Sequence, residues 1–172
     1  TDFCDYSETM LNPLNQLSPR ISASFSITEK LSFNSNIGRY LQLPAYTAMG
    51  YRESDSLVNK NNLSYISCDH FVGGLEYAIG SNSKTTIEAF YKNYSGYPLL
   101  LSDSISLANL GSDFGVIGND RVSSISNGRS YGLEFLYQQK LYKGFYGVVA
   151  YTLVRSEFGD KNDKLISSAW DN

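Results

Sequence analysis

The chain alternates apolar and polar residues most regularly along Arg20-Ile21-Ser22-Ala23-Ser24-Phe25-Ser26-Ile27-Thr28. Apolar side chains occupy every second position, and serines occupy the positions between them. A repeat of two residues is typical of a β-strand, because successive side chains of a strand point to opposite faces of the sheet. This stretch therefore predicts a strand with one apolar face and one hydroxylated face.

Five more segments show the same alternation, although both faces of the last one are mostly apolar. The predicted strands cover about 20–28, 31–41, 69–80, 85–95, 129–141 and 145–158. These lengths match or exceed the roughly 9–11 residues that a tilted strand needs to cross the hydrocarbon of a membrane. Strands of soluble sheets are usually shorter, so the lengths favour strands that span a membrane.

Short turns and long loops take turns between these strands. The short turns lie at 28–30, 81–84 and 142–144. The long loops, rich in Ser, Asn, Asp and Gly, lie at 44–68, 96–128 and 159–172. Outer membrane barrels have short turns on one rim and long loops on the other, whereas compact soluble domains rarely contain such long loops. We therefore predict an all-β, antiparallel up-and-down meander of about six long strands, a segment of an outer membrane β-barrel.

In this interpretation each strand turns one face to lipid and the other to the lumen of the barrel. The residues expected to contact lipid are Ile21, Phe25, Leu75, Tyr77, Ile87, Tyr91, Leu133, Phe135 and Val149. The residues expected to line the lumen are Ser22, Ser24, Asn34, Asn36, Glu88, Lys92 and Glu134. Transfer of the lipid-facing side chains out of water stabilises the inserted protein by about 25 cal/mol per Å² of apolar surface. Water or another protein segment can solvate the side chains that face the lumen.

Three of the lumen residues are charged and lie on two strands that are expected to pair. They are Glu88, Lys92 and Glu134. Opposite charges across a strand pair contribute roughly 0.2–1 kcal/mol. The sequence therefore predicts a ladder of opposite charges in the lumen, with separate solvation of each charge as an equal alternative.

The composition is compatible with a membrane barrel without establishing one. The chain has 172 residues, of which 18% are charged and 14% aromatic, and its 14 tyrosines suit the interfaces of a membrane. A soluble β-sandwich that binds carbohydrate or mediates adhesion has a similar composition and stays open as an alternative. A passive porin segment is a second alternative. The net charge of −3 gives no indication of nucleic-acid binding.

The ends of the sequence also bear on its organisation. Six strands are fewer than the eight of the smallest bacterial barrels, and residues 168–172 fall inside what reads as a loop. We therefore expect residues 1–172 to form one partial barrel segment that belongs to a larger protein.

Five short motifs follow one another along the chain. They are NPLNQLSPRISA at 12–23, GRYLQLP at 38–44, GLEY at 74–77, EAFYKNY at 88–94 and GLEF at 132–135. In order and spacing they resemble strand signatures of TonB-dependent outer membrane receptors. The resemblance covers most of the chain from Asn12 onwards, apart from the loop interiors.

This resemblance implies a part in energy-coupled uptake of a scarce nutrient across the bacterial outer membrane. In such receptors an N-terminal plug domain fills a large barrel, and an inner-membrane energy-coupling protein opens it. The sequence contains no plug, no coupling segment and no closing strand, so we expect transport only from the parent protein. The nutrient itself is not encoded by the alternation.

Aromatic side chains in the long loops are the candidates for contact with the nutrient, because their rings can stack on a sugar, a chelate or another ring. These candidates are Tyr46, Tyr51, Tyr65, Tyr97 and Phe114. Packing within the loops themselves is the alternative role for each ring.

The two cysteines offer a possible cross-link. Cys4 precedes the first predicted strand and Cys68 ends the loop before the third, so both are expected at the outer rim. An oxidising compartment permits a disulfide between them, and two free thiols are the alternative.

The sequence contains no convincing catalytic, cofactor or metal site. His70 is the only histidine, beside Asp69 and Cys68, whereas a metal site needs several converging ligands. The G-x-S-x-G pattern at 128–132 leads from a loop into a strand rather than from a strand into a helix, as the hydrolase motif requires. We therefore expect neither enzyme activity nor a cofactor.

Overall fold

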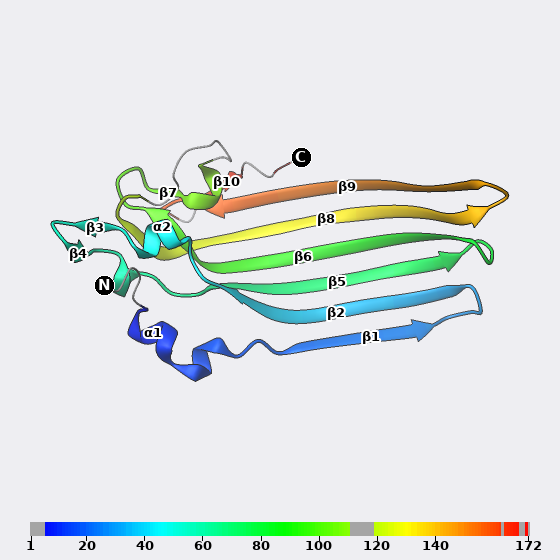
Figure 1. Cartoon of the computed structure of the whole chain (residues 1–172), viewed down its shortest axis with the longest axis horizontal. Coiled ribbons are helices and arrows are strands. Elements are labelled where there is room, and N and C mark those ends of the chain that lie inside the picture. The colour runs from blue at the N-terminus through cyan, green and yellow to red at the C-terminus, as the bar shows by residue number, and fades with distance from the viewer. Residues whose placement is uncertain (1–5, 111–118, 163, 169–170, 172) are drawn as a thin grey trace.

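The computed structural model describes residues 6–110, 119–162, 164–168 and 171. Six long strands lie side by side, with a group of short elements at one end and tight turns at the other (Figure 1). The long strands are β1 (Arg20–Ser26), β2 (Leu31–Gln42), β5 (Ile66–Ala78), β6 (Ser83–Leu100), β8 (Val122–Tyr142) and β9 (Phe145–Gly159).

Neighbours in the sheet follow the order of the chain. The order is β1-β2-β5-β6-β8-β9-β10, and all pairs are antiparallel. The short strand β10 (Leu165–Ser167) extends β9, and β7 (Ile105–Ser106) pairs with β6. The predicted all-β, up-and-down meander is confirmed.

The short elements occupy the long connections and form a cap at one end of the sheet (Figure 1). Two short helical elements precede the sheet, and the others lie in the connections that follow β2 and β6. They are α1 (Glu8–Leu11), η1 (Pro13–Gln16), α2 (Tyr46–Met49), β3 (Arg52–Glu53), β4 (Ser56–Leu57), η2 (Lys60–Asn62) and η3 (Leu107–Asn109). At the opposite end, Lys143 and Gly144 connect β8 to β9 with φ of 50° and 81°. Two successive positive φ angles suit the twist of a tight hairpin.

Three strands extend farther into the cap than the alternation predicts. β5 begins at Ile66 rather than at 69, β6 continues to Leu100 rather than to 95, and β8 begins at Val122 rather than at 129. The register of β6 and β8 shifts near Tyr97, and Gly96 beside it has a φ of +70°. Such a bulge breaks the alternation while the backbone pairing continues, which explains why the alternation in β6 and β8 covers only part of each strand.

One face of the sheet, called the apolar face below, carries a complete row of large apolar side chains. Successive strand pairings align Phe25, Phe33, Leu75, Ile87, Phe135 and Tyr151. All nine residues that the sequence assigns to lipid lie on this face, and each is between 39% and 69% exposed.

The opposite face, called the polar face, carries the residues that the sequence assigns to the lumen. Asn36 donates a hydrogen bond of 2.8 Å to Ser22, and Ser24 donates one of 2.7 Å to Asn34. These bonds join β1 to β2 through side chains as well as through the backbone.

The predicted ladder of opposite charges is wrong. Glu88 is aligned with Glu134, so two like charges lie opposite each other, and Lys92 is aligned with Ser130. The register of β6 and β8 decides this arrangement, and the sequence alone does not reveal it.

Buried apolar side chains gather in the cap rather than between faces of the sheet. The cluster contains Met10, Ala48, Met49, Leu63, Leu100, Leu107 and Val122. A β-sandwich would bury the alternating face of its strands, whereas here that face is exposed. The arrangement of the apolar side chains thus contradicts the sandwich alternative.

Helices of the described part of the chain are all too short or too polar to cross a membrane.

A charge on the apolar face tests whether that face meets lipid. We expect Ile87→Arg to lower the free energy of unfolding of the membrane-inserted protein by about 2–4 kcal/mol, the range for a cation near the middle of a barrel's lipid face. Urea titration of the protein in lipid vesicles measures this difference. Ser24→Arg on the polar face is the control and should change stability far less; equal effects would contradict the assignment of the faces.

Candidate functional site

A hollow of about 550 Å³ opens on the polar face where the long strands reach the cap. A second hollow, of about 720 Å³, adjoins it beside α2 and η3. The two share the lining residues Leu41, Gln42, Ile66, Tyr97 and Ala108. Together they form the mouth hollow.

Aromatic rings from β2, β6 and β9 form one wall of the mouth hollow. Phe158 of β9 is 4% exposed, and its ring centre lies 5.3 Å from that of Tyr94 and 4.8 Å from that of Tyr97. Tyr40 of β2 belongs to the same cross-strand row through Cys68. Aromatic pairs at these separations attract each other beyond their area of contact, so the wall is held in place by its own rings.

Gly128 of β8 makes room for the Phe158 ring. A Cβ atom at position 128 would lie 2.2 Å from Cδ1 of Phe158, a distance that no packed pair of carbons tolerates. Gly128 is aligned with both Tyr94 and Phe158. The absence of a side chain at this position therefore lets the ring lie flat over β8.

The described residues that line the mouth hollow include no Asp, Glu, Lys, Arg or His. Their polar groups are neutral and belong mainly to tyrosines, serines and one glutamine. Within the described part of the chain, the side chains of Gln42, Ser130 and Ser156 make no hydrogen bond. The hollow therefore offers neutral donors and acceptors beside aromatic rings.

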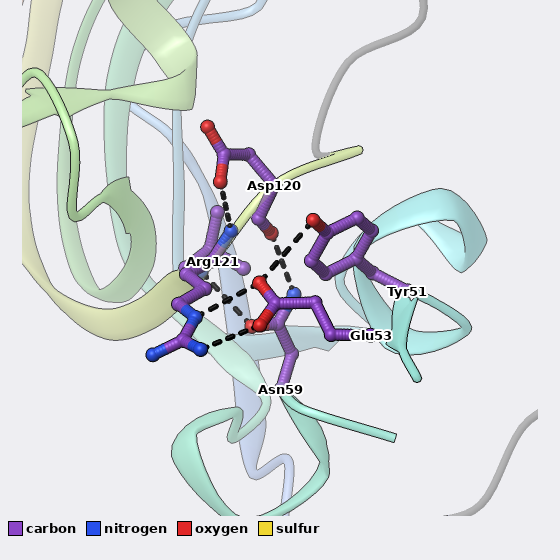
Figure 2. Close-up of polar contacts among 6 residues, drawn as sticks. Tyr51, Glu53, Asn59, Asp120 and Arg121 are labelled. Atoms are coloured by element: carbon purple, nitrogen blue, oxygen red, sulfur yellow. Dashed lines mark hydrogen bonds and ion pairs between the residues drawn. The ribbon is translucent and has the colours of Figure 1, made fainter. Parts of the chain in front are cut away.

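A buried amide joins the two large connections of the cap. Asn59 is 0% exposed and donates from Nδ2 to the carbonyl oxygens of Ala48, at 2.9 Å, and Asp120, at 2.8 Å. Its Oδ1 accepts a hydrogen bond of 3.0 Å from the backbone N–H of Val122, and Figure 2 shows Asn59 beside Asp120. The helix α2, which borders the hollow, is thereby tied to the start of β8.

An ion pair reinforces the same junction at the surface. Figure 2 shows the Glu53 carboxylate between Arg121 and Tyr51. Arg121 donates from Nε to Oε1 of Glu53 at 2.9 Å, and the Tyr51 hydroxyl donates to the same oxygen at 3.3 Å. The hydrogen bond from Arg121 is the largest effect on the carboxylate, and it lowers the pKa of Glu53.

Three of the five aromatic candidates from the loops lie at the mouth hollow, and two do not. Tyr46 and Tyr65 line its second part and Tyr97 lines both parts. Tyr51 lies at the ion pair instead, and Phe114 lies outside the described residues. Whether any of them contacts a nutrient stays a prediction.

Tyr40, Tyr94 and Phe158 also line the hollow but are not among the predicted residues, because those candidates all come from the loops. All three lie in strands, at the ends next to the cap and on the polar face. The signal that could have identified them is an aromatic residue at a polar-face position within the last few residues of a strand.

Cys68 lies within β5 and lines the mouth hollow, whereas the sequence placed it at the end of a loop. The longer pairing of β5 with β2 and β6 accounts for the difference. Cys4 lies outside the described residues, so the disulfide between Cys4 and Cys68 stays a prediction.

His70 lies on the polar face of β5, where its ring meets the edge of Tyr40 at a centroid distance of 5.7 Å. In the described ranges, no three residues among His, Cys, Asp and Glu converge as a metal site would require.

A family model described as "TonB dependent receptor-like, beta-barrel" matches residues 3–170. The chain belongs to the TonB-dependent receptor family. No match was found among the curated proteins or among the solved structures. The resemblance of the five strand motifs to this family is confirmed.

Membership places the chain in the bacterial outer membrane, as part of the β-barrel of a receptor. The apolar face is then the lipid face, and the polar face with the mouth hollow is the lumen face. The family is one of transport receptors rather than enzymes. The match also favours the receptor over the soluble sandwich and the passive porin.

Removal of the buried amide should loosen the cap. Asn59→Ala leaves two carbonyl oxygens and one N–H without their partner, and each unpaired buried group costs about 1–3 kcal/mol. We expect faster hydrogen exchange of the amides near Val122, measured by mass spectrometry on the membrane-inserted receptor. Asn62→Ala, three residues along the same connection, is the control and should leave the exchange unchanged.

The ion pair predicts a pH dependence of the cap. In the folded protein the pKa of Glu53 lies below its usual 4.5. The ion pair with Arg121 therefore stabilises the folded state fully above pH 4.5, and this stabilisation is lost as the pH falls through the lowered pKa. Wild type should therefore melt at a higher temperature than Glu53→Gln near neutral pH, by a small margin because the pair is exposed. The difference should vanish in acid; a gap that widens in acid would refute this role.

Proposed function

We propose that this chain forms part of the wall and the outer mouth of a receptor for energy-coupled nutrient uptake, and that the nutrient is captured at the mouth hollow. The observation that carries the proposal is the uncharged, ring-lined hollow on the lumen face beside the cap. Long connections mark the outer rim of such barrels, so this end of the sheet faces the surroundings of the cell. A nutrient that arrives from outside meets the hollow first.

The pairing of the sheet supports a larger parent barrel. β1 pairs on one side only, and β10 covers only Glu157, Phe158 and Gly159 of β9, within the described part of the chain. Within hydrocarbon, unpaired backbone groups cost several kcal/mol each, and only a closed barrel satisfies them. Strands from elsewhere in the receptor therefore complete the wall in this proposal.

The polar face supplies a path that water can solvate. Below the hollow it carries Ser22, Ser24, Asn34 and Asn36, together with the aligned pair Glu88 and Glu134. A plug domain that fills the lumen would contact this face, and an inner-membrane energy-coupling protein would supply the work of import. In this proposal the strands form the barrel wall and bind the ligand, and they catalyse no reaction.

Ring removal tests capture at the hollow. A strain that lacks the receptor gene should lose growth on at least one scarce nutrient from a panel of carbon sources, metal chelates and cobalamin. Complementation with Phe158→Ala should raise the concentration of that nutrient needed for half-maximal uptake about tenfold, because Tyr94 and Tyr97 lose the ring that holds them in place and ring packing of this kind contributes about 0.5–1.5 kcal/mol. Maximal uptake at saturation should change little, because the coupling machinery is intact.

Tyr146→Ala is the matched control, because Tyr146 is an aromatic residue at the opposite end of β9 and is 73% exposed. It should behave as wild type. A deletion strain that grows like its parent on every nutrient of the panel would overturn the proposed function.

A further inference from the structure

We propose that the mouth hollow takes an uncharged carbohydrate of more than one ring rather than an anionic metal chelate. This inference rests on the proposed function and names its ligand class. Three features of the hollow carry it: the absence of charge from its lining, the neutral polar groups left open to it, and its size.

The lining argues against a charged ligand. The chain contains 14 Lys and Arg and 17 Asp and Glu, yet none of them is among the described residues that line the hollow. A charged ligand would lose part of its hydration there without meeting an opposite charge, and an unpaired charge is costly to desolvate. A neutral ligand avoids this cost.

The nearest cations on the same face are already placed against rings of the protein. The guanidinium carbon of Arg20 lies 4.1 Å from the centre of the Tyr40 ring, and Nζ of Lys92 lies 5.1 Å from that of Phe90. Tyr40 lines the hollow, so the Arg20 guanidinium is held against a lining ring, whereas Phe90 does not line it. Neither cation lines the hollow.

The open polar groups match hydroxyls. The amide of Gln42, which is exposed, and the hydroxyls of Ser130 and Ser156, which are 8% and 5% exposed, can each donate and accept a hydrogen bond, and within the described residues they are unpaired. A sugar carries hydroxyls at its edge, which are donors and acceptors, and C–H groups on its face, which pack on aromatic rings. Tyr94 and Tyr97, which are half-buried, provide such rings beside these polar groups, and the buried Phe158 packs against both and holds them in place.

The size of the hollow favours more than one sugar ring. Its two adjoining parts measure about 550 and 720 Å³, and pockets of roughly 300–1,000 Å³ hold a drug-sized ligand. Tyr97 lies at the junction, since it lines both parts. A short oligosaccharide can therefore occupy both parts while one ring stacks near Tyr97.

Calorimetric titration of the whole purified receptor in detergent tests the inference. The probes are short gluco-, xylo-, manno-, galacto- and fructo-oligosaccharides on one side, and ferric citrate and a ferric catecholate on the other. We expect at least one saccharide to bind, with affinity about tenfold weaker in Phe158→Ala and in Tyr97→Ala. Phe158→Tyr, which keeps the ring, and the control Tyr146→Ala should stay within about threefold of wild type.

Two results would overturn the ligand class: binding of an iron chelate that Phe158→Ala or Tyr97→Ala abolishes, or failure of every saccharide to bind. Heat-dependent migration of the barrel in gels reveals whether a variant has failed to fold. If one of the two alanine variants fails to fold, the other still tests the inference. The growth panel separates the two levels of the proposal. A deletion strain that loses iron-chelate uptake but keeps saccharide use refutes only the ligand class, whereas one with no defect refutes receptor function itself.

Discussion

Backbone hydrogen bonding between neighbouring strands is the constraint on which the rest of this structure depends. Within hydrocarbon no water replaces a missing partner, so the strands must stay paired along their whole length. β5 pairs with β2 from Ile66 to Tyr77, without a shift of register. Because a slip of one residue would exchange the two faces of a strand, this fixed register turns a simple alternation into a lipid face and a lumen face. The same strand register aligns the rings of the aromatic wall at the mouth.

The lumen face is layered along the strands. The first layer below the cap holds the aromatic row that includes Tyr40, Tyr94 and Phe158. The next layer carries Arg20, His70 and Lys92, and a deeper one carries Glu88 and Glu134. From the cap inward, the polar face thus presents rings, then Arg20, His70 and Lys92, then the two carboxylates, and each layer draws on different strands at the same height.

The fold could be predicted from the sequence to the extent that it depends on local alternation. The spacing of Ile21 and Phe25 alone predicts that they share one face of the sheet. The tight turn at Lys143 and Gly144 depends only on residues next to each other in the chain, so it too can be predicted. The extension of β6 past Gly96 could not be predicted, because a bulge breaks the alternation while pairing continues.

The site was predicted less well, because it is assembled from distant parts of the chain. Three of the loop tyrosines lie at the hollow, but its wall depends on Phe158 lying over Gly128, two residues of different strands. Such a contact depends on register, which no spacing of residues within one strand encodes. The alignment of Glu88 with Glu134 escaped prediction for the same reason.

Asn59 gives the cap a dependence on the correct assembly of the sheet. Its amide oxygen accepts from Val122, which is 63 positions away along the chain. That partner arrives only when β6 and β8 have paired in the native alignment, because β8 begins at Val122 and Leu100 is its neighbour across the ladder. A strand paired out of alignment would leave the amide without this partner, and the cap would be accessible to proteases. The connections of the cap therefore reach their final packing only after β6 and β8 have paired in register.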